Sequence, residues 1–146
     1  MARRPGAAQQ GMLDGMECCR RRGQRGEDLA ADWLEARGFR ILKRNLRRRQ
    51  AGEVDLLAER DGVLHVVEVK CGRGPLELLL ERVDERKLRL LLKTLARSGW
   101  LEGGPGRPTH CRVDVLLVQL DPQGPQLHFL EDLCPPELRW EGGADV

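Results

Sequence analysis

The sequence has few aromatic side chains and no long apolar run. It contains no tyrosine, and aromatic residues make up 3% of its 146 residues. Recognition of unpaired bases by stacking on aromatic rings is therefore poorly supported. The leucine runs at residues 78–80 and 90–92 are far shorter than the roughly 18 apolar residues that a membrane helix needs. We therefore expect no membrane-spanning helix.

Targeting signals and paired cysteines are equally scarce. The first residues, Met-Ala-Arg-Arg-Pro-Gly, lack the apolar segment of a secretory signal, so the cytoplasm is the expected location. The five cysteines form no Cys-x-x-Cys pair, and two of them, Cys18 and Cys19, are adjacent. An odd number without metal-ligand spacing indicates reduced thiols and argues against a structural zinc site.

The net charge of +2 is unevenly distributed. Residues 1–52 contain 13 Lys/Arg and 6 Asp/Glu, whereas residues 53–146 contain 12 and 17. A basic first part followed by an acidic body indicates an anionic partner held close to a carboxylate site. Residues 1–22, rich in Gly, Gln and Arg without periodicity, are expected to be a disordered basic tail, and residues 135–146 a loose C-terminal tail. Residues 23–134 then form one domain.

The apolar pattern predicts two helices and several strands. Helical spacing predicts one helix over residues 24–37, ended by Gly38, and a second over residues 82–98. Strands are expected in residues 39–46, in both arms of a hairpin over residues 52–70, and in residues 112–120 and 127–133. This order of elements predicts an α/β or α+β fold in one domain.

Acidic residues interrupt the hairpin, which is the most hydrophobic part of the chain. With a two-residue turn at residues 61–62, opposed residue numbers sum to 123, so that Asp55 faces Glu68 and Glu53 faces Lys70. Because side chains alternate, Asp55, Glu68 and Lys70 are expected on one face of the sheet. The other face carries four apolar residues expected in the core: Val54, Leu56, Val67 and Val69.

Two opposed carboxylates in a partly buried site would share a proton or bind a cation. Oxygen ligands favour Mg²⁺ or Mn²⁺, and Lys70 beside them would orient the attacking water or stabilise the growing negative charge on a phosphate. Glu27 lies on the inward stripe of the first predicted helix and is placed to complete the ligand shell. The simpler alternatives are a surface hairpin with a Glu53–Lys70 salt bridge, and a Glu27 that only stabilises the helix dipole.

A basic stripe follows the second predicted helix. Its members recur at steps of three or four: Arg82, Arg86, Arg89, Lys93 and Arg97. Like charges repel at this spacing, and a phosphate backbone alongside would relieve the repulsion. The alternative is the solvated face of an ordinary amphipathic helix.

Several motifs together resemble the YraN family of small bacterial proteins. They are Gly26-Glu27, Trp33-Leu34, Gly38, Ile41-Leu42-x-Arg44-Asn45, Gly52-Glu-Val-Asp-Leu-Leu-Ala58, Val66-Val-Glu-Val-Lys70, Val83-x-x-x-Lys87, Arg112-Val-Asp-Val115 and Leu127-x-Phe-Leu, within residues 23–133. That family is similar to the PD-(D/E)xK nucleases, especially the archaeal Holliday junction resolvases. The resemblance implies an α/β, restriction-endonuclease-like domain, in which helices flank a mixed central sheet.

The resemblance also implies a site. The catalytic residues would be Glu27, Asp55, Glu68 and Lys70, with Mg²⁺ (or Mn²⁺) held by Asp55, Glu68 and Glu27. Phosphates would be held by Arg44, Arg47, Arg48, Arg73, Arg86, Lys87 and Arg89. The sequence departs from the pattern at Val54, where the superfamily often has proline, and at Cys71-Gly72, which delays the next basic residue to Arg73.

The implied function is metal-dependent hydrolysis of phosphodiester bonds in DNA, including branched or recombination and repair intermediates. A homodimer would suit cleavage of two strands. The alternatives are a non-catalytic nucleic-acid-binding module of repair or recombination machinery, and an interaction protein that uses its basic helix against an acidic partner. Cleavage and binding assays with Asp55→Ala separate the nuclease from the binding module, and salt-sensitive binding to protein but not to DNA would indicate the interaction protein.

Single residues carry less information. His65, on the core-facing side of the hairpin, is expected to be a packing residue, and Trp33 and Trp100 are expected in the core. Asp114 stands within an apolar strand, where a buried acid needs a partner that the sequence does not identify.

Overall fold

Five strands form one mixed sheet. The computed structural model describes residues 23–48, 52–83, 85–97, 108 and 110–133. The strands are β1 (Arg40–Arg48), β2 (Gly52–Arg60), β3 (Val63–Gly72), β4 (His110–Asp121) and β5 (Gly124–Leu130), in the spatial order β1-β2-β3-β4-β5. β3 and β4 are parallel, and the other neighbours are antiparallel. The predicted mixed sheet is confirmed, whereas the predicted tails and Trp100 lie outside the described residues.

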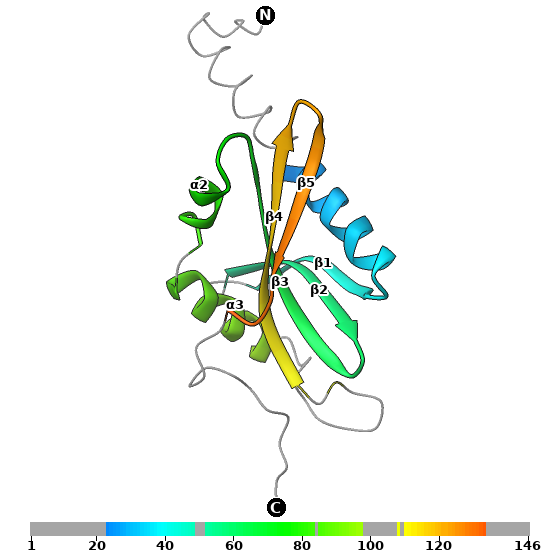
Figure 1. Cartoon of the computed structure of the whole chain (residues 1–146). Coiled ribbons are helices and arrows are strands. Elements are labelled where there is room, and N and C mark those ends of the chain that lie inside the picture. Colours follow the sequence, from blue (N-terminus) through cyan, green and yellow to red (C-terminus); the bar gives the residue numbers. More distant parts are fainter. Residues whose placement is uncertain (1–22, 49–51, 84, 98–107, 109, 134–146) are drawn as a thin grey trace, which may run out of the picture.

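Helices cover both faces of this sheet (Figure 1). One helix spans residues 23–36 and packs on one face. α2 (Leu76–Leu80) and α3 (Glu85–Arg97) connect the parallel strands β3 and β4 and pack on the other face. The arrangement confirms the predicted α/β fold with a flanked central sheet. No helix in the described parts of the chain has the length and apolarity needed to cross a membrane.

Two apolar layers explain why the sheet is buried on both sides. Ala30 and Leu34 of the first helix pack with Leu56, Val67 and Leu116. On the opposite face, the α3 residues Leu88 and Leu91 pack with residues of the sheet that include Leu57, Val66 and Val113. A parallel strand covered by helices on both faces has no solvent-exposed face, which accounts for the nearly continuous apolar stretches in β3 and β4.

Element boundaries differ from the predictions around the second helix. The predicted helix over residues 82–98 begins only at Glu85, and Arg82 lies in a turn, where its backbone N–H donates to the Leu79 carbonyl at 3.2 Å. The short α2 was not predicted, because five residues are too few for helical periodicity to show. Gly99, the predicted helix end, lies outside the described residues.

The strand ends differ as well. Arg47 and Arg48, predicted in a loop, belong to β1 and lie opposite Glu53 and Gly52 of β2. The last strand runs over Gly124–Leu130 rather than residues 127–133. In both cases antiparallel pairing includes residues outside the predicted strand: β1 continues along β2 to Arg48, and β5 begins along β4 at Gly124.

The hairpin register is confirmed only near its turn. The pairs run from Arg60–Val63 to Leu56–Val67, all with residue numbers that sum to 123, and the ladder between β2 and β3 ends there. Val54 packs in the cluster beneath α3 rather than in the cluster that contains Leu56. The prediction that these two residues share one face is therefore wrong, because β2 twists away from β3.

A buried side-chain hydrogen bond connects β3 and β4. His65 Nδ1 lies 2.5 Å from Asp114 Oδ2, and the other Asp114 oxygen accepts the Asp132 backbone N–H at 2.7 Å. The side chains of His65 and Asp114 are 3% and 0% exposed. The predicted core position of His65 is confirmed, and this histidine is the partner that Asp114 requires. The Phe39 ring closes the site by an edge contact to His65.

The first helix crosses β3 at Gly26. A Cβ atom added at Gly26 would lie 2.5 Å from Cys71 Cβ and 2.9 Å from its Sγ, so only glycine permits this approach. The next residue in the chain is Glu27, which is half-buried. The close crossing therefore sets the distance between Glu27 and the sheet.

Gly26→Ala should lower the free energy of unfolding by about 1–3 kcal/mol, because overpacking pushes the helix off β3. Addition of Cys71→Gly should restore most of the loss, since it removes the clashing atoms. Gly23→Ala is the matched control, because nothing lies within 4 Å of the added Cβ atom. Urea denaturation measures all three, and a Gly26→Ala protein as stable as the unmodified chain would contradict the assignment.

Candidate active site

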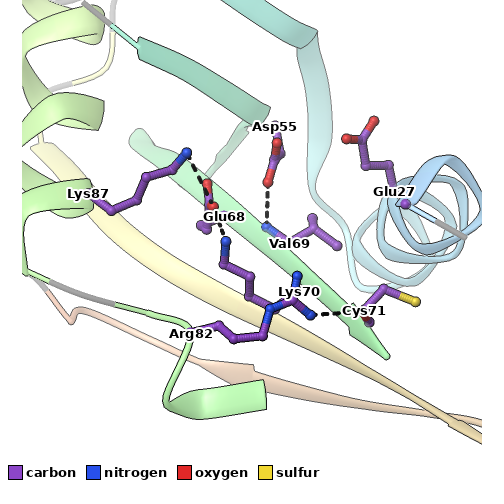
Figure 2. Close-up of a pocket in the computed structure, with 9 residues that line it drawn as sticks. Glu27, Asp55, Glu68, Val69, Lys70, Cys71, Arg82 and Lys87 are labelled. Atoms are coloured by element: carbon purple, nitrogen blue, oxygen red, sulfur yellow. Dashed lines mark hydrogen bonds and ion pairs between the residues drawn. The ribbon is translucent and has the colours of Figure 1, made fainter. Parts of the chain in front are cut away.

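A cavity of about 420 Å³ lies between the first helix, β3 and the start of α3. It is lined by Gly23, Glu27, Asp55, Glu68, Val69, Lys70, Cys71, Arg82 and Lys87. The four predicted catalytic residues therefore meet in one place, although they come from three different elements (Figure 2).

Asp55 stands where β2 parts from β3. Its Oδ2 accepts the backbone N–H of Val69 at 2.8 Å. Counted from the hairpin turn, the last backbone pair between β2 and β3 is Leu56–Val67, and Asp55 is the next residue of β2. The Asp55 carboxylate therefore accepts the hydrogen bond of a β3 amide that no β2 carbonyl reaches. This bond holds the Asp55 side chain against β3, next to Glu68.

Glu68 is an almost fully buried carboxylate, with 2% exposure. Its Oε1 lies 2.9 Å from Lys70 Nζ and 3.7 Å from Lys87 Nζ. Its Oε2 is also buried and has no hydrogen-bond partner among the described residues. A buried acceptor without a donor costs about 1–3 kcal/mol. This oxygen is suited to accept a ligand.

Crowding of carboxylates perturbs their protonation. Burial, followed by the charge of Glu68, raises the pKa of Asp55 to about 7. Burial also raises the pKa of Glu27, with a further contribution from Glu53 and an opposing hydrogen bond from Asn45. Desolvation and like charges both disfavour the ionised form of a carboxyl group. The ionised forms of Asp55 and Glu27 are therefore destabilised unless a positive charge is placed beside them.

Three positive side chains line the cavity, and two of them, Lys70 and Lys87, lie beside Glu68. Lys70 comes from β3, Lys87 from α3, and Arg82 from the turn between α2 and α3 (Figure 2). Arg82 is fixed by a hydrogen bond from Nη1 to the Cys71 carbonyl at 3.1 Å. Carboxylates and cations therefore share the cavity, with Glu68 between two ammonium groups and Arg82 held against β3.

The structure separates the residues predicted to hold phosphates. Lys87 lines the cavity with Glu68, whereas Arg86 and Arg89 are exposed on α3. Arg73 lines a second cavity of about 380 Å³ together with Arg25. Of the predicted phosphate-binding side chains that the structure describes, only that of Lys87 lines the candidate site.

Two β1 arginines are already paired with acids. Arg44 Nη2 lies 2.5 Å from Asp28 Oδ1, and Arg47 Nε lies 3.1 Å from Glu53 Oε2. Arg48 stands at the end of β1, opposite Gly52. Arg44 and Arg47 would have to exchange a carboxylate for a phosphate in order to bind nucleic acid.

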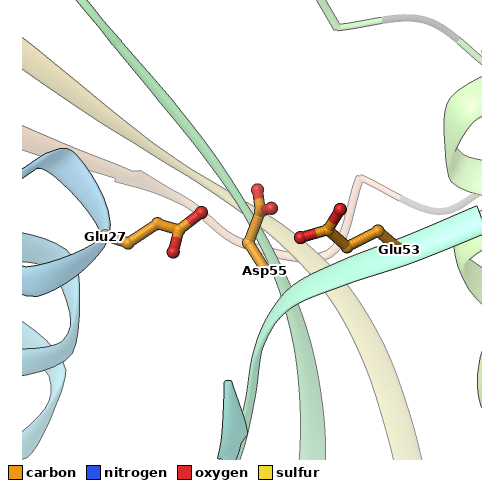
Figure 3. A group of neighbouring side chains, drawn as sticks. All are labelled: Glu27, Glu53 and Asp55. Atoms are coloured by element: carbon orange, nitrogen blue, oxygen red, sulfur yellow. The ribbon is translucent and has the colours of Figure 1, made fainter. Parts of the chain in front are cut away.

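The predicted partner of Glu53 differs from the observed one. The predicted Glu53–Lys70 pair is wrong: Lys70 pairs with Glu68, and Glu53 pairs with Arg47, because β2 leaves β3 before it reaches Glu53. Carboxylate oxygens of Glu53, Glu27 and Asp55 all lie within 4.8 Å of one another (Figure 3). The spacing of two residues between Glu53 and Asp55, which puts both on one side of a strand, was the available signal.

The donor set fits a hard divalent cation. Carboxylate oxygens are the ligands that Mg²⁺ and Mn²⁺ prefer, and the buried Oε2 of Glu68 has no hydrogen-bond partner among the described residues. No Cys or His ligand belongs to the acidic group that the described residues form. The residues present therefore fit the cation that the sequence predicts.

Fold and cavity define an α/β protein with a carboxylate–lysine cleft at the point where two strands part. The sequence model of the family described as "Uncharacterised protein family UPF0102" matches residues 26–118, so the chain belongs to this family, which confirms the predicted YraN resemblance. The match includes every residue that lines the cleft except Gly23.

Individual relatives carry the same family description. The chain is 43% identical over 110 residues to UPF0102 protein STH1475 of Symbiobacterium thermophilum, covering 72% of this chain and 87% of that protein. It is 32% identical over 111 residues to a UPF0102 protein of Sulfurovum sp., covering 76% and 91%. A Campylobacter jejuni UPF0102 protein is 44% identical over 70 residues, which cover 48% of this chain and 61% of that protein.

The raised pKa of Asp55 predicts that the metal-free protein loses stability as pH rises. The unfolded carboxyl group releases its proton near pH 4 and the folded one near pH 7, so the folded state holds the extra proton in between. The free energy of unfolding should fall across this window, by at most about 4 kcal/mol, and level off above pH 8.

Denaturation in EDTA at several pH values tests this dependence, with Asp55→Asn as the comparison. The amide cannot titrate, so the variant should lose less stability between about pH 5 and pH 8 than the unmodified chain. Parallel pH profiles for the two proteins would contradict the assigned pKa.

Proposed function

We propose that the protein is a metal-dependent nuclease that hydrolyses phosphodiester bonds in DNA. The observation that carries the proposal is the meeting of Glu27, Asp55, Glu68 and Lys70 in one cavity, with one buried oxygen of Glu68 left without a donor among the described residues. The family resemblance to PD-(D/E)xK nucleases supports the same residues in the same roles.

Asp55 and Glu68 would hold Mg²⁺ or Mn²⁺, with Glu27 as a supporting ligand. When bound, such an ion would neutralise charge on a phosphodiester oxygen and activate water for attack. Asp55 is held in place by the Val69 amide, and Glu68 by two ammonium groups, so neither carboxylate has to reorient before it binds.

Lys70 serves the reacting phosphate. Its side chain is 16% exposed and its ammonium lies beside Glu68, so it faces the cavity in a poorly solvated position. A fixed positive charge in such a position stabilises the negative charge that grows on the phosphate in the transition state. Lys87 adds a second ammonium group from α3, and Arg82 adds a guanidinium group beside the Cys71 carbonyl.

A DNA backbone is the anion that fits the surroundings of the cavity. Arg86 and Arg89 are exposed on α3, the same helix that places Lys87 in the cavity. A phosphate chain that enters the cavity would pass these residues as it leaves, and their positive charge would be neutralised by neighbouring phosphates. Recognition through the backbone accords with the shortage of aromatic side chains.

The proposal predicts cleavage that requires both a divalent ion and Asp55. Single-stranded, duplex and four-way-branched DNA, incubated with Mg²⁺ or Mn²⁺, should yield cleaved products from at least one substrate, and EDTA should stop the reaction. Asp55→Asn should lower the rate at least about a hundredfold, because it removes a ligand charge. Product analysis on denaturing gels measures the effect.

Glu59→Gln is the matched control, since Glu59 also lies on β2 but pairs with Arg40 away from the cavity. It should cleave at the unmodified rate. Binding of DNA that survives Asp55→Asn, with no cleavage by any of the proteins, would instead identify a non-catalytic nucleic-acid-binding module. The homodimer stays a prediction from the resemblance.

Two neighbouring residues of α3 should affect different kinetic constants. Lys87 lines the cavity beside Glu68, whereas Arg86 is exposed. Lys87→Met should therefore lower kcat about ten- to a hundredfold with little change in KM, because it removes charge next to the reacting phosphate. Arg86→Met should mainly raise KM and weaken the salt dependence of binding. Equal effects of both substitutions on KM alone would contradict the separate roles.

A further inference from the structure

Asn45 has an unusual backbone conformation for a residue inside a strand. Its φ angle is +52°, in the left-handed region that residues with a Cβ atom adopt at a cost. Among the described residues other than glycine, Asp61 and Asp132 share this feature, but Asp61 lies in the β2–β3 turn and Asp132 follows the end of β5. A turn does not explain Asn45, because β1 pairs with β2 on both sides of it. Left-handed residues kept outside turns cluster at functional sites.

The conformation coincides with a change of face in the neighbouring strand. The residues of β1 on either side of Asn45 lie opposite Leu56 and Val54 of β2. Residues two positions apart share a face in a regular strand, yet Leu56 packs with the first helix and Val54 packs with α3. Asp55, the residue between them, lines the cavity. Asn45 and Asp55 therefore stand where the paired strands rotate.

Two consecutive side chains of β1 contact the first helix. Arg44 Nη2 lies 2.5 Å from Asp28 Oδ1, and the Asn45 side chain forms a hydrogen bond with the Glu27 carboxyl group. The amide N–H of Asn45 is the donor, since an ionised carboxylate only accepts. Successive side chains of a regular strand point to opposite faces and would not both face one helix. The left-handed residue thus lets neighbouring residues of β1 hold neighbouring residues of the helix.

The hydrogen bond from Asn45 acts on a side chain of the candidate active site. Glu27 and Asp55 line the cavity together, and the Glu27 side chain extends from the helix toward Asp55 (Figure 3). A glutamate has several rotamers, and a hydrogen bond from a fixed neighbour selects one of them. Asn45 is fixed by the strand pairs on both sides of it. It therefore does for Glu27 what the Val69 amide does for Asp55.

We propose that Asn45 is a positioning residue of the candidate active site: its left-handed backbone turns Asp55 toward the cavity, and its side-chain amide holds the Glu27 carboxylate in the orientation that supports a divalent cation. Asn45 does not line the cavity and acts through Glu27. The inference rests on the proposed metal dependence and adds a residue to it. The simpler alternative is an asparagine retained only because it tolerates a left-handed conformation. Glycine tolerates that conformation too, which separates the two explanations.

Asn45→Gly removes the amide and keeps the backbone conformation, so in EDTA it should melt close to the temperature of the unmodified chain. Isothermal titration of the EDTA-treated full chain with Mn²⁺ should show an affinity about ten- to a hundredfold weaker, the usual cost of losing the hydrogen-bond partner of a ligand. Asp61→Gly is the matched control, because Asp61 has the same φ angle of +52° but does not line the cavity. It should bind Mn²⁺ normally.

A double-mutant cycle tests whether Asn45 acts through Glu27. Glu27→Ala should weaken Mn²⁺ binding, and addition of Asn45→Gly to it should weaken binding by less than about twofold further, because the carboxylate that Asn45 holds is already absent. In the cleavage assay, Asn45→Gly should lower kcat with little change in KM, since the amide does not touch the substrate.

An unchanged Mn²⁺ affinity in Asn45→Gly would overturn the proposal and leave the nuclease proposal in place, because the asparagine would then serve the backbone alone. This holds also if Asn45→Gly melts at a much lower temperature, and losses that add fully in the cycle would have the same meaning. Mn²⁺ binding that depends on Asn45 through Glu27, with no cleavage of any DNA, would support the positioning role and overturn the nuclease proposal. No Mn²⁺ binding by the unmodified chain would overturn both.

Discussion

Repulsion between the carboxylates of Asp55 and Glu68 is the constraint on which the site depends. The two side chains line one cavity in which Glu68 is almost fully buried, and burial of Asp55 together with the charge of Glu68 raises the pKa of Asp55 to about 7. Such an arrangement destabilises the protein when both carboxyl groups are ionised, so the surrounding structure must supply compensating stabilisation. A bound divalent cation would remove the repulsion. It would also bind the Oε2 atom of Glu68, which has no hydrogen-bond partner among the described residues.

The rest of the fold holds these groups at fixed positions. Separation of β2 from β3 after Leu56–Val67 opens the space that the carboxylates occupy, and the Asp55–Val69 bond closes the exposed end of the ladder. Gly26 lets the first helix approach β3, which brings Glu27 to the cavity. α3 approaches from the other side and adds Lys87. Local strand separation, one glycine and one helix face therefore produce a cleft that carboxylates and cations share.

Local signals in the sequence were sufficient to predict the hairpin and the grouping of three of the site residues. The Asp61-Gly62 turn fixed the hairpin register, and alternation then placed Asp55, Glu68 and Lys70 together, as the cavity lining bears out. Features that depend on distant segments were not predictable in the same way. Asp114 meets His65 only because β3 and β4 pair in parallel, 49 residues apart. Alternation places Glu53 on the same side of β2 as Asp55, but their meeting with Glu27 depends on how the first helix packs on the sheet, which local signals do not reveal.

The most direct test of the account is an anomalous difference map from crystals grown with saturating Mn²⁺. The account predicts a peak at coordination distance from both Asp55 and Glu68, with the Oε2 atom of Glu68 as a ligand. An empty position between these two carboxylates, with a protonated Asp55 that donates a hydrogen bond to Glu68, would contradict it.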